Sequence, residues 1–373
     1  MRRLLPLLCG LLLAACGQRA ARPIGDFTLP VYTPRYASGF EITGAAGSRS
    51  TLVTVHNPWY GDEVTDQYLF IARDGEPAPA GFEGQVLRDE ARRVVCMSGS
   101  YIAMLDALGA ADRVVGVSGA QYLINETLRR RIARGEAADV GFDSNVDFER
   151  LMALRPDLVM LFGIGGADTA LTGKLRELGI PYLYMGEHCE ESPLGKSEWV
   201  VVAAEIAGLR TEGSRLFAAI PERYERLRAL AQQTAARPRV MLNTPYRDTW
   251  FMPARNSYMV RLLEDAGARY VFEENTATQT LPIDIEQAYY LTSKSDFWLN
   301  VSGCNTLDEV RRQNPRLADT PPVREGRVYD NNRRRNAAGG SDFWESGVLR
   351  PDRVLARSEE HTSELQSHEP ISY

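Results

Sequence analysis

Residues 93–119, RVVCMSGSYIAMLDALGAADRVVGVSG, decide the fold of this chain. The apolar run at 94–97 ends in a polar Ser-Gly-Ser turn. Residues 101–108 then carry apolar side chains at helical spacing, and Gly109 ends that helix. A second apolar run, VVGV, follows at 114–117. Short apolar strands that alternate with helices predict a parallel sheet covered on both faces.

The same alternation continues along the chain and then repeats. It is interrupted by two stretches of helix-favouring residues, at 198–207 and 212–233. The stretch LMALRPDLVMLFGIGGADTALTGKL (151–175) lines up with AYYLTSKSDFWLNVSGCNTLDEV (288–310). Each predicts a helix, a polar break with Asp, an apolar strand, a Gly-containing turn and another helix. A repeat of a whole lobe predicts a two-lobed protein rather than a solenoid of short units.

The region before the first lobe has a different character. Residues 23–92 are rich in Gly, Pro, Thr and aromatic residues, and they contain short runs such as TLVTV (51–55) and QYLFI (67–71). Turns are indicated at Asp74-Gly75 and at Pro77. These features predict a β-rich N-terminal extension.

The N-terminus has the features of a secretory signal. Two arginines follow Met1, a short apolar stretch comes next, and Leu-Ala-Ala-Cys at 13–16 matches the bacterial lipoprotein lipobox. The match predicts cleavage before Cys16 and attachment of lipid to it, which would hold the protein on a membrane surface. The alternative is a plain secretion signal with a chance cysteine.

The C-terminus carries an unusual string. Residues 357–368, RSEEHTSELQSH, resemble the translation of a common sequencing-library adapter, and they interrupt a predicted helix that begins near Pro351. We therefore expect residues 357–373 to be foreign to the natural protein. The alternative is an ordinary polar tail.

The composition is that of a folded globular protein. With 44% hydrophobic residues and a mean hydropathy of −0.28, the 373-residue chain is neither disordered nor a multi-span membrane protein. A net charge of −6 gives no electrostatic case for binding nucleic acid.

Histidines and cysteines are too few for an obvious metal site. Between residues 16 and 356 the histidines are His56 and His188, which cannot build a three-histidine cage. No C-x-x-C pair occurs. If Cys16 is acylated, at most one disulfide can form among the remaining thiols, and their spacing does not say which. Those remaining thiols are Cys96, Cys189 and Cys304.

Common catalytic motifs are incomplete. The sequence GVSG at 116–119 is not G-x-S-x-G, and GIGG at 163–166 is followed by Asp168 where the dinucleotide fingerprint needs a third glycine. No Walker sequence occurs. We predict no catalytic residues, no metal site and no cofactor. The alternative is a surface-anchored α/β hydrolase or an enzyme that processes metal chelates.

Four stretches, taken in order, resemble one known family. They are residues 93–119, NVDFERLMALRPDLVM (145–160), WFMPARNSYMVRLLEDAGARYVF (250–272) and GSDFWESGVLRPDRVL (340–355). Together with the lipobox and the lobe repeat, they resemble the periplasmic binding proteins for vitamin B12, iron–siderophores and haem. The resemblance covers roughly residues 93–356.

The resemblance implies an α/β fold of two Rossmann-like lobes joined by a long helix, with a β-rich N-terminal extension. Ligand is then expected in the cleft at the C-terminal ends of the strands. The last helix of the second lobe can return to the first. The expected segments are a signal peptide (1–15), a lipid anchor with the extension (16–92), an N-terminal lobe (93–195), a helical linker region (196–236), a C-terminal lobe (237–356) and the foreign tail (357–373).

Side chains that follow the predicted strands are the candidate ligand contacts. Aromatic residues suit flat ligands, and arginines suit ligands that carry carboxylates. The basic run NNRRRN at 331–336 could also be a solvated loop, and Asn145 is in addition the predicted N-cap of a helix at 145–154. For Glu187 and His188, metal ligation and a structural role are both open. The candidates are Ser98, Ser100, Tyr101, Tyr122, Asn145, Glu187, His188, Tyr246, Trp250, Tyr258, Asn332, Arg333 and Arg335.

The resemblance also implies partners. In relatives, one acidic residue on each lobe pairs with arginines of a permease. Here Asp168 stands in the first lobe, where relatives usually have Glu, and Asp308 or Glu309 stands in the second. These acids could equally stabilise helix starts. We therefore predict a monomeric, lipid-anchored binding protein of the periplasm or cell envelope. It would capture an iron complex (siderophore or haem) or cobalamin and deliver it, without turnover, to an ABC permease and its ATPase.

Overall fold

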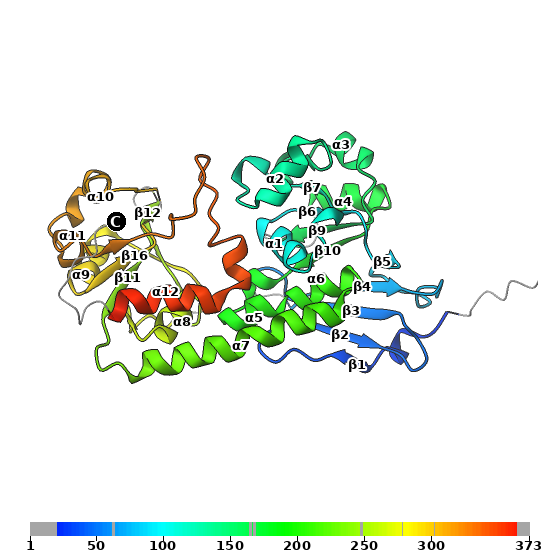
Figure 1. Ribbon diagram of the computed structural model, residues 1–373, viewed down its shortest axis with the longest axis horizontal. Helices are drawn as coiled ribbons and strands as arrows, with labels where there is room; N and C mark the ends of the chain where they lie inside the picture. The colour runs from blue at the N-terminus through cyan, green and yellow to red at the C-terminus, as the bar shows by residue number, and fades with distance from the viewer. Residues whose placement is uncertain are drawn as a thin grey trace, which may run out of the picture.

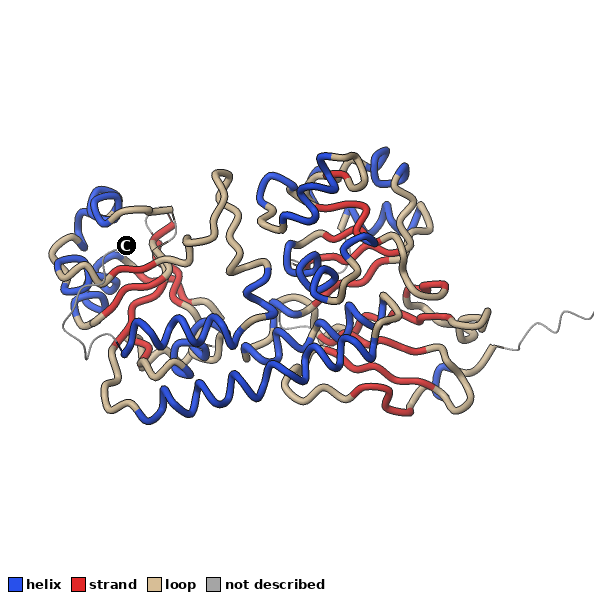
Figure 2. The backbone as a smooth tube through the Cα atoms, viewed as in Figure 1, coloured by secondary structure: helices blue, strands red, loops and turns tan. Residues whose placement is uncertain are grey.

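Two parallel sheets and a third, N-terminal sheet organise the computed structural model. It describes residues 21–61, 64–163, 166, 169–246, 249–277, 279–301 and 303–363. Figure 1 shows two α/β lobes standing side by side above one long helix, with the N-terminal sheet beside the first lobe. Figure 2 shows strands (red) inside each lobe with helices (blue) around them, and a long loop (tan) that rises between the lobes.

The first lobe (the N-lobe) is built on a five-stranded parallel sheet in the order β10-β9-β6-β7-β8. Its strands are short and almost wholly buried, as helices on both faces require. The strands are β6 (Val94–Cys96), β7 (Val114–Val117), β8 (Ala138–Asp139), β9 (Leu158–Phe162) and β10 (Tyr182–Met185). The helices between them are α1 (Gly99–Ala107), α2 (Glu126–Ala133), α3 (Phe148–Ala153) and α4 (Ala170–Glu177).

Side-chain caps fix where these helices begin. Asn125 caps α2 by accepting a hydrogen bond from the amide of Leu128, and Thr169 caps α4. The N-cap of α3 is Asp147, whose carboxylate accepts from the amide of Arg150. The predicted N-cap, Asn145, instead closes a short 3-10 helix, where its side chain accepts from the amide of Phe142. The prediction was wrong because this 3-10 turn separates Asn145 from the helix.

The second lobe (the C-lobe) has a four-stranded parallel sheet in the order β14-β11-β16-β17 and a three-stranded antiparallel sheet in the order β12-β13-β15. The strands are β11 (Arg239–Leu242), β12 (Pro245–Tyr246), β13 (Thr249–Met252), β14 (Arg269–Tyr270), β15 (Leu281–Ile283), β16 (Phe297–Leu299) and β17 (Val328–Tyr329). The helices are α8 (Tyr258–Asp265), α9 (Ile285–Ser293), α10 (Leu307–Gln313) and α11 (Pro321–Arg324).

The N-terminal extension is a five-stranded sheet that shares a hydrophobic core with the N-lobe. Its inward face supplies Phe40, Ile42, Val53 and Leu69 to the same buried cluster as α1 and α6. All neighbouring strands are antiparallel except β4 and β5. The strands are β1 (Leu29–Tyr32), β2 (Phe40–Gly44), β3 (Thr51–His56), β4 (Asp66–Ala72) and β5 (Gln85–Arg88). The β-rich extension predicted from the sequence is therefore present, and it is continuous with the first lobe.

Buried carboxylates attach this extension to the helices that follow the N-lobe sheet. Glu198 accepts hydrogen bonds from the amides of Tyr36 and Ala37, both at 2.7 Å, and Glu190 accepts from the amide of Gly39 at 2.9 Å. Because these carboxylates pair with backbone amides, the loop that precedes β2 needs no water to satisfy its donors.

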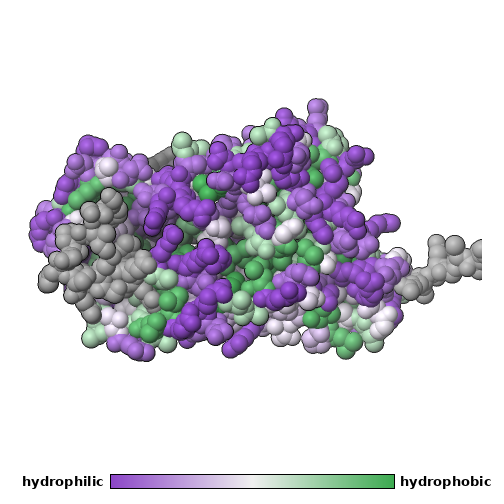
Figure 3. All heavy atoms as spheres, viewed as in Figure 1, coloured by the Kyte–Doolittle hydropathy of each residue, from purple (hydrophilic) through white to green (hydrophobic). Residues whose placement is uncertain are grey.

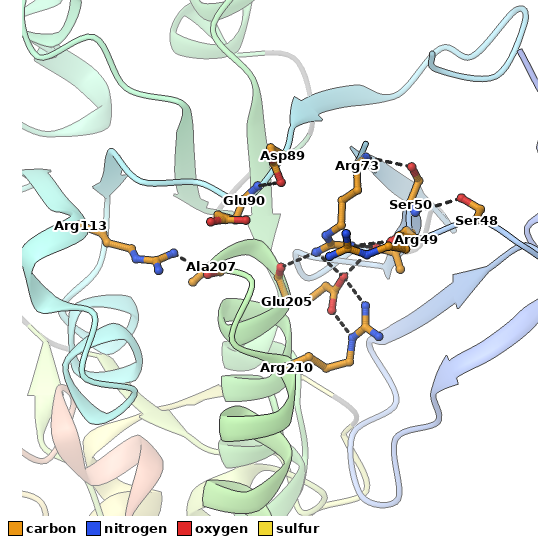
Figure 4. A network of polar contacts seen from close by, with 11 residues as sticks. Ser48, Arg49, Ser50, Arg73, Asp89, Glu90, Arg113, Glu205, Ala207 and Arg210 are labelled. Atoms are coloured by element: carbon orange, nitrogen blue, oxygen red, sulfur yellow. Dashed lines mark hydrogen bonds and ion pairs between the residues drawn. The ribbon is translucent and has the colours of Figure 1, made fainter. Parts of the chain in front are cut away.

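A second set of buried polar contacts connects β3 and the end of β4 to the helices α6 and α7. Figure 4 shows the carboxylate of Glu205 between Arg73 and Arg210. The Glu205 side chain is fully buried, and Thr51 also donates to it, at 2.6 Å. Burial alone would raise the pKa of Glu205, but the arginines and Thr51 outweigh it and lower that pKa.

Three helices connect the lobes. α5 (Pro193–Glu198) and α6 (Val200–Ile206) are buried in the N-lobe core, and α7 (Arg210–Gln233) is the long helix. Its 24 residues span about 36 Å at 1.5 Å per residue, and in Figure 1 it runs beneath both lobes. The helix that joins the lobes is therefore α7, the C-terminal part of the predicted linker region.

The chain returns to the N-lobe after β17. Residues 331–345, which we call the strap, rise between the two lobes and are drawn in orange and red in Figure 1. The 3-10 helix η7 (Ser346–Leu349) then packs against α1 and α5, and Val348 and Leu349 join the N-lobe core. The last helix, α12 (Pro351–Ser363), lies along α7. The segment that reaches the N-lobe is thus the strap with η7.

Short 3-10 helices occupy many of the turns. They are η1 (Ile24–Asp26), η2 (Ala111–Arg113), η3 (Ala120–Tyr122), η4 (Asp143–Asn145), η5 (Glu187–Cys189), η6 (Pro315–Leu317) and η7. Within the described ranges, no helix combines the length and the apolar character needed to cross a membrane.

Candidate ligand-binding cleft

The segment that follows β10 in the N-lobe contacts the start of α8 in the C-lobe. Across this junction, the side-chain amide of Asn256 in the C-lobe donates to the carboxylate of Glu191 in the N-lobe. The Lys196 ammonium lies over the ring of Tyr258, 5.1 Å from its centroid. Figure 3 shows apolar atoms gathered near the middle of the side that it draws, with largely hydrophilic atoms around them. Open α/β sheets bind their ligands at such strand ends.

Exposed aromatic side chains stand on η3, on β12 and on the strap. Tyr122 follows β7 and is 45% exposed, and its ring centroid lies 6.1 Å from that of Phe142. Tyr246 in the C-lobe is 66% exposed, and Trp344 on the strap is 47% exposed. Large aromatic rings left open at strand ends provide faces on which a flat ligand can stack.

The strap adds positive charge. Arg334 forms an ion pair with Asp342 at 2.8 Å, which ties it to the strap itself. Its neighbours Arg333 and Arg335 are exposed, and in the part of the chain that the structure describes neither forms an ion pair. Their guanidinium groups are therefore available to a carboxylate-bearing ligand.

A cavity of about 380 Å³ lies beneath the base of the strap. Its floor is apolar and includes Leu242, Leu262 and Leu299, and Arg333 and Arg357 are among the residues on its wall. The cavity continues from the ends of β16 and β17 along the sheet face that α12 covers.

Buried polar groups occupy the N-lobe side of the cleft. Ser100 donates to one carboxylate oxygen of Glu187 at 2.8 Å, and Ser98 lies 2.9 Å from Ser100. The second oxygen of Glu187 has no hydrogen-bond partner and is 3.9 Å from Nδ1 of His188. These contacts show that Ser100 and Glu187 bind each other below the surface of the cleft.

His188 contacts the backbone of Gly163 and the ring of Phe162. Its Nε2 lies 2.8 Å from the carbonyl oxygen of Gly163, and its ring packs on Phe162. Burial opposes its protonation, but Cys189 and Glu187 favour it, and the pKa of His188 is raised to about 9. Among the described residues, no group of three His, Cys, Asp or Glu side chains is placed to hold a metal ion.

Several predicted contacts prove to be buried, and we withdraw them as ligand-facing residues. Trp250 is 1% exposed, donates its indole N–H to the carbonyl oxygen of Leu242, and packs on Trp298 in the C-lobe core. Tyr101 lies on the inward side of α1 with no exposed surface, and Tyr258 is buried beneath Lys196. Ser100 and Glu187 are also buried. Trp250 lies within β13, Tyr101 within α1 and Tyr258 within α8, so a position near a predicted strand end did not give the direction of these side chains.

The alternation along β13 shows what the sequence reading missed. Trp250 and Met252 point inward, whereas Phe251 is exposed between them. The candidates that keep accessible surface are Ser98, Tyr122, Asn145, His188, Tyr246, Asn332, Arg333 and Arg335. Phe142, which the sequence also places at a strand end, and Trp344 are exposed as well, and the signal for Trp344 was an aromatic residue in a polar, turn-rich segment.

The proposed docking acids differ in their surroundings. Asp168 lies outside the described residues. Asp308 is exposed at the start of α10 and pairs with Arg311 at 3.0 Å. The carboxylate of Glu309 accepts from the amide of Asn305 at 2.6 Å, so it also orders the beginning of this helix.

The cysteines in the described region are free. Cys96 and Cys304 are buried and Cys189 is partly buried. Burial raises the pKa of Cys96 and of Cys304, which keeps both as neutral thiols.

Comparison with known proteins supports this architecture. The model of the periplasmic binding protein family matches residues 94–333. An uncharacterized lipoprotein of Methanocaldococcus jannaschii is 24% identical over 322 residues, which is 80% of this chain and 75% of the relative.

Two solved structures have a similar fold. One is a periplasmic heme binding protein from Pseudomonas aeruginosa, with a TM-score of 0.56 and 20% identity, covering 76% of this chain and 95% of that one. The other is the periplasmic vitamin B12 binding protein of Vibrio cholerae, with a TM-score of 0.54 and 14% identity, covering 74% and 99%. At these identities the likeness shows the fold alone.

Proposed function

The chain belongs to the periplasmic binding protein family, and on that premise we propose that it captures an iron complex or cobalamin between its lobes for an ABC importer. The family and the structural neighbours are substrate-binding proteins, not enzymes. We therefore expect stoichiometric binding without turnover.

The main support for this class of ligand is the combination of exposed aromatic rings and arginines near the strand ends and on the strap. Tyr122, Tyr246 and Trp344 supply exposed ring faces, and Arg333 and Arg335 supply guanidinium groups without ion pairs among the described residues. Haem, a ferric siderophore and cobalamin are all large, and the first two carry anionic groups that such arginines recognise. The names of relatives that bind heme or vitamin B12 are consistent with this class.

The helices α7 and α12 should limit how far the lobes can close. α7 is a continuous helix, and α12 packs along it. A helical connection bends less readily than a loop hinge, so we expect ligand capture with only a small change in the angle between the lobes.

Two further features belong to this proposal. Lipid on Cys16 would keep the protein at the membrane that holds its permease, and a related lipoprotein supports this assignment. Asp168 on one lobe, with Asp308 or Glu309 on the other, would contact arginines of the permease.

Ligand-induced stabilisation tests the proposal. The full chain, purified in detergent, is heated with haemin, a ferric hydroxamate siderophore, a ferric catecholate siderophore or cyanocobalamin. We expect one of them to raise the melting temperature in a concentration-dependent way, because a ligand selective for the folded state stabilises it by mass action. Absence of a shift with all four would reject the ligand class.

A further inference from the structure

The side chain of Asn336, on the strap, forms hydrogen bonds with the backbone of the N-lobe. The amide nitrogen of Asn336 donates to the carbonyl oxygen of Gln121 at 2.9 Å and to that of Leu123 at 3.2 Å. Its oxygen accepts from the amides of Ala338 and Gly340, at 3.1 and 2.9 Å. A carboxamide has two donors and two good acceptor positions, so Asn336 uses its full capacity. One half of the group shapes the strap's own turn, and the other half binds the N-lobe.

The next contact depends on a glycine. A Cβ atom on Gly340 would lie 1.7 Å from the carbonyl oxygen of Tyr122, far inside van der Waals distance. The backbone of the strap therefore touches the backbone of the loop between Gln121 and Leu123. Any larger residue at position 340 would push the strap away from this loop.

A third contact completes the attachment. Glu345, which is buried, accepts from the amide of Ile124 at 2.9 Å. Three strap residues thus contact four consecutive residues, 121–124, through backbone atoms. Backbone contacts of this kind fix the position of the loop, and they do not depend on the side chains that the loop presents.

The loop held in this way carries the main aromatic candidate of the N-lobe. Tyr122 projects from it toward Phe142. On the other side, the carboxylate of Asp139 accepts from the amides of Gly119 and Ala120, at 3.2 and 2.7 Å. The strap itself carries Arg333, Arg335 and Trp344. The attachment therefore joins the aromatic pair of one lobe to the basic segment of the other.

We propose that Asn336 is a positioning residue, which latches the strap to loop 119–125 so that Tyr122 and the strap arginines form one pre-organised ligand-binding surface. This inference rests on the proposed function. A surface ordered before binding loses less conformational entropy when the ligand arrives. We expect the gain mainly as slower dissociation, because differences within one interface are expressed mostly in the off-rate.

Asn336→Asp separates the two roles of the side chain. The carboxylate can still accept from the amides of Ala338 and Gly340, but it cannot donate to Gln121 and Leu123. Asn331→Asp is the matched control, because the Asn331 amide donates to Asn300 within the C-lobe, at 3.4 Å. Gly340→Ala is a second, independent way to release the latch through the contact with Tyr122.

Hydrogen exchange of the ligand-free full chain tests the latch directly. Loss of the two hydrogen bonds in Asn336→Asp, and the steric clash with Tyr122 in Gly340→Ala, are each expected to speed amide exchange in residues 119–125 by at least about fivefold. Asn331→Asp should leave this region unchanged. Exchange in 119–125 equal to that of the unmodified chain, in both latch variants, would overturn the proposal whether or not a ligand is known.

Dissociation kinetics test the link to binding. The probe is whichever of haemin, the ferric hydroxamate siderophore, the ferric catecholate siderophore and cyanocobalamin binds the unmodified chain, and we expect Asn336→Asp to release it about tenfold faster. Faster exchange with unchanged release would show that the strap latch does not position the ligand surface, and would overturn the inference. If none of the probes binds the unmodified chain, the proposed ligand class fails, while the exchange measurement still decides whether the latch exists.

Discussion

Arg73 and Glu205, which are 132 residues apart in the sequence, form a buried ion pair with 2.9 Å between Nη2 and Oε1. Arg73 comes from the end of the N-terminal sheet, and Glu205 lies in α6. The pair therefore joins the extension to the helices beneath the N-lobe. Together with the shared hydrophobic core, this ion pair packs the extension against the first lobe.

Removing this carboxylate should strongly destabilise the protein. Glu205→Ala leaves the guanidinium of Arg73 buried without a counter-charge, so we expect a loss of about 3–5 kcal/mol in the free energy of unfolding. Thermal and denaturant unfolding measure it. Glu225→Ala is the control, because Glu225 forms a partly exposed pair with Arg228 and should cost less than about 1 kcal/mol. Equal effects would show that the buried pair contributes no more than a surface pair.

The carboxyl group of Glu345 should make the stability of the strap depend on pH. Burial raises its pKa to about 7, nearby Asp342 adds to the rise, and Arg334 and the backbone amides of Ile124 and Asn125 oppose it. The folded state therefore binds the proton more tightly than the unfolded state. Its stabilising contribution is complete below about pH 4.5 and is lost as the pH rises through about 7.

Between pH 5 and pH 8 we therefore expect the unmodified chain to lose up to about 3 kcal/mol relative to Glu345→Gln, which cannot ionise. Paired denaturation curves at several pH values check this difference. A constant difference across the range would contradict the assignment of the raised pKa to Glu345.

Tyr122 and Trp250 should behave in opposite ways when replaced by alanine. Tyr122 is exposed and is a proposed ligand contact, so Tyr122→Ala should weaken binding of the active probe about tenfold or more and leave the melting temperature nearly unchanged. Trp250 fills the C-lobe core, so Trp250→Ala should cost about 3–5 kcal/mol of stability. Calorimetry and ligand titration on the same two proteins separate these outcomes. A stable Trp250→Ala protein that binds poorly would restore Trp250 as a ligand contact.

Filling the cavity beneath the strap with an apolar side chain should stabilise the folded protein. We proposed that residues from 357 onward are foreign to the natural chain, and Arg357 and Ser358 form part of the wall of this largely apolar cavity. Ser358→Leu should fill space there and raise the free energy of unfolding by about 0.5–2 kcal/mol. Glu222→Leu, at an exposed position of α7, is the control and should not stabilise. Sequencing the 3′ end from genomic DNA tests the origin of the tail directly.

The docking acids should matter for uptake and not for ligand affinity. Replacement of Asp168, Asp308 and Glu309 by alanine should impair transport in cells, because the proposed contacts with the permease are lost. Ligand affinity should stay the same, because none of the three is a proposed ligand contact. Glu286→Ala removes an exposed acid that pairs with Arg316 at 3.6 Å and serves as the control. Transport equal to that of the unmodified protein would remove the three acids from the docking role.

The predictable part of the structure is local. The alternation within 93–119 and the repeat of 151–175 in 288–310 give two parallel sheets, because helix and strand periods are set by neighbouring residues. The N-cap of α3 was misplaced by two residues, from Asn145 to Asp147, because both residue types cap helices and only the turn geometry distinguishes them.

The sequence by itself determined the two-lobed α/β architecture, the β-rich extension and the family to which the chain belongs. Only the tertiary structure decided which of the candidate side chains stay accessible: Tyr122 does, whereas Trp250 and Tyr101 are buried. It also decided that Asn336 of the strap binds residues 121–123 and that Glu205 joins the extension to α6. The physical reason is that hydrophobic pattern fixes local periods. Contacts between residues more than a hundred positions apart depend instead on how the elements pack, on the direction of each side chain and on burial of charge.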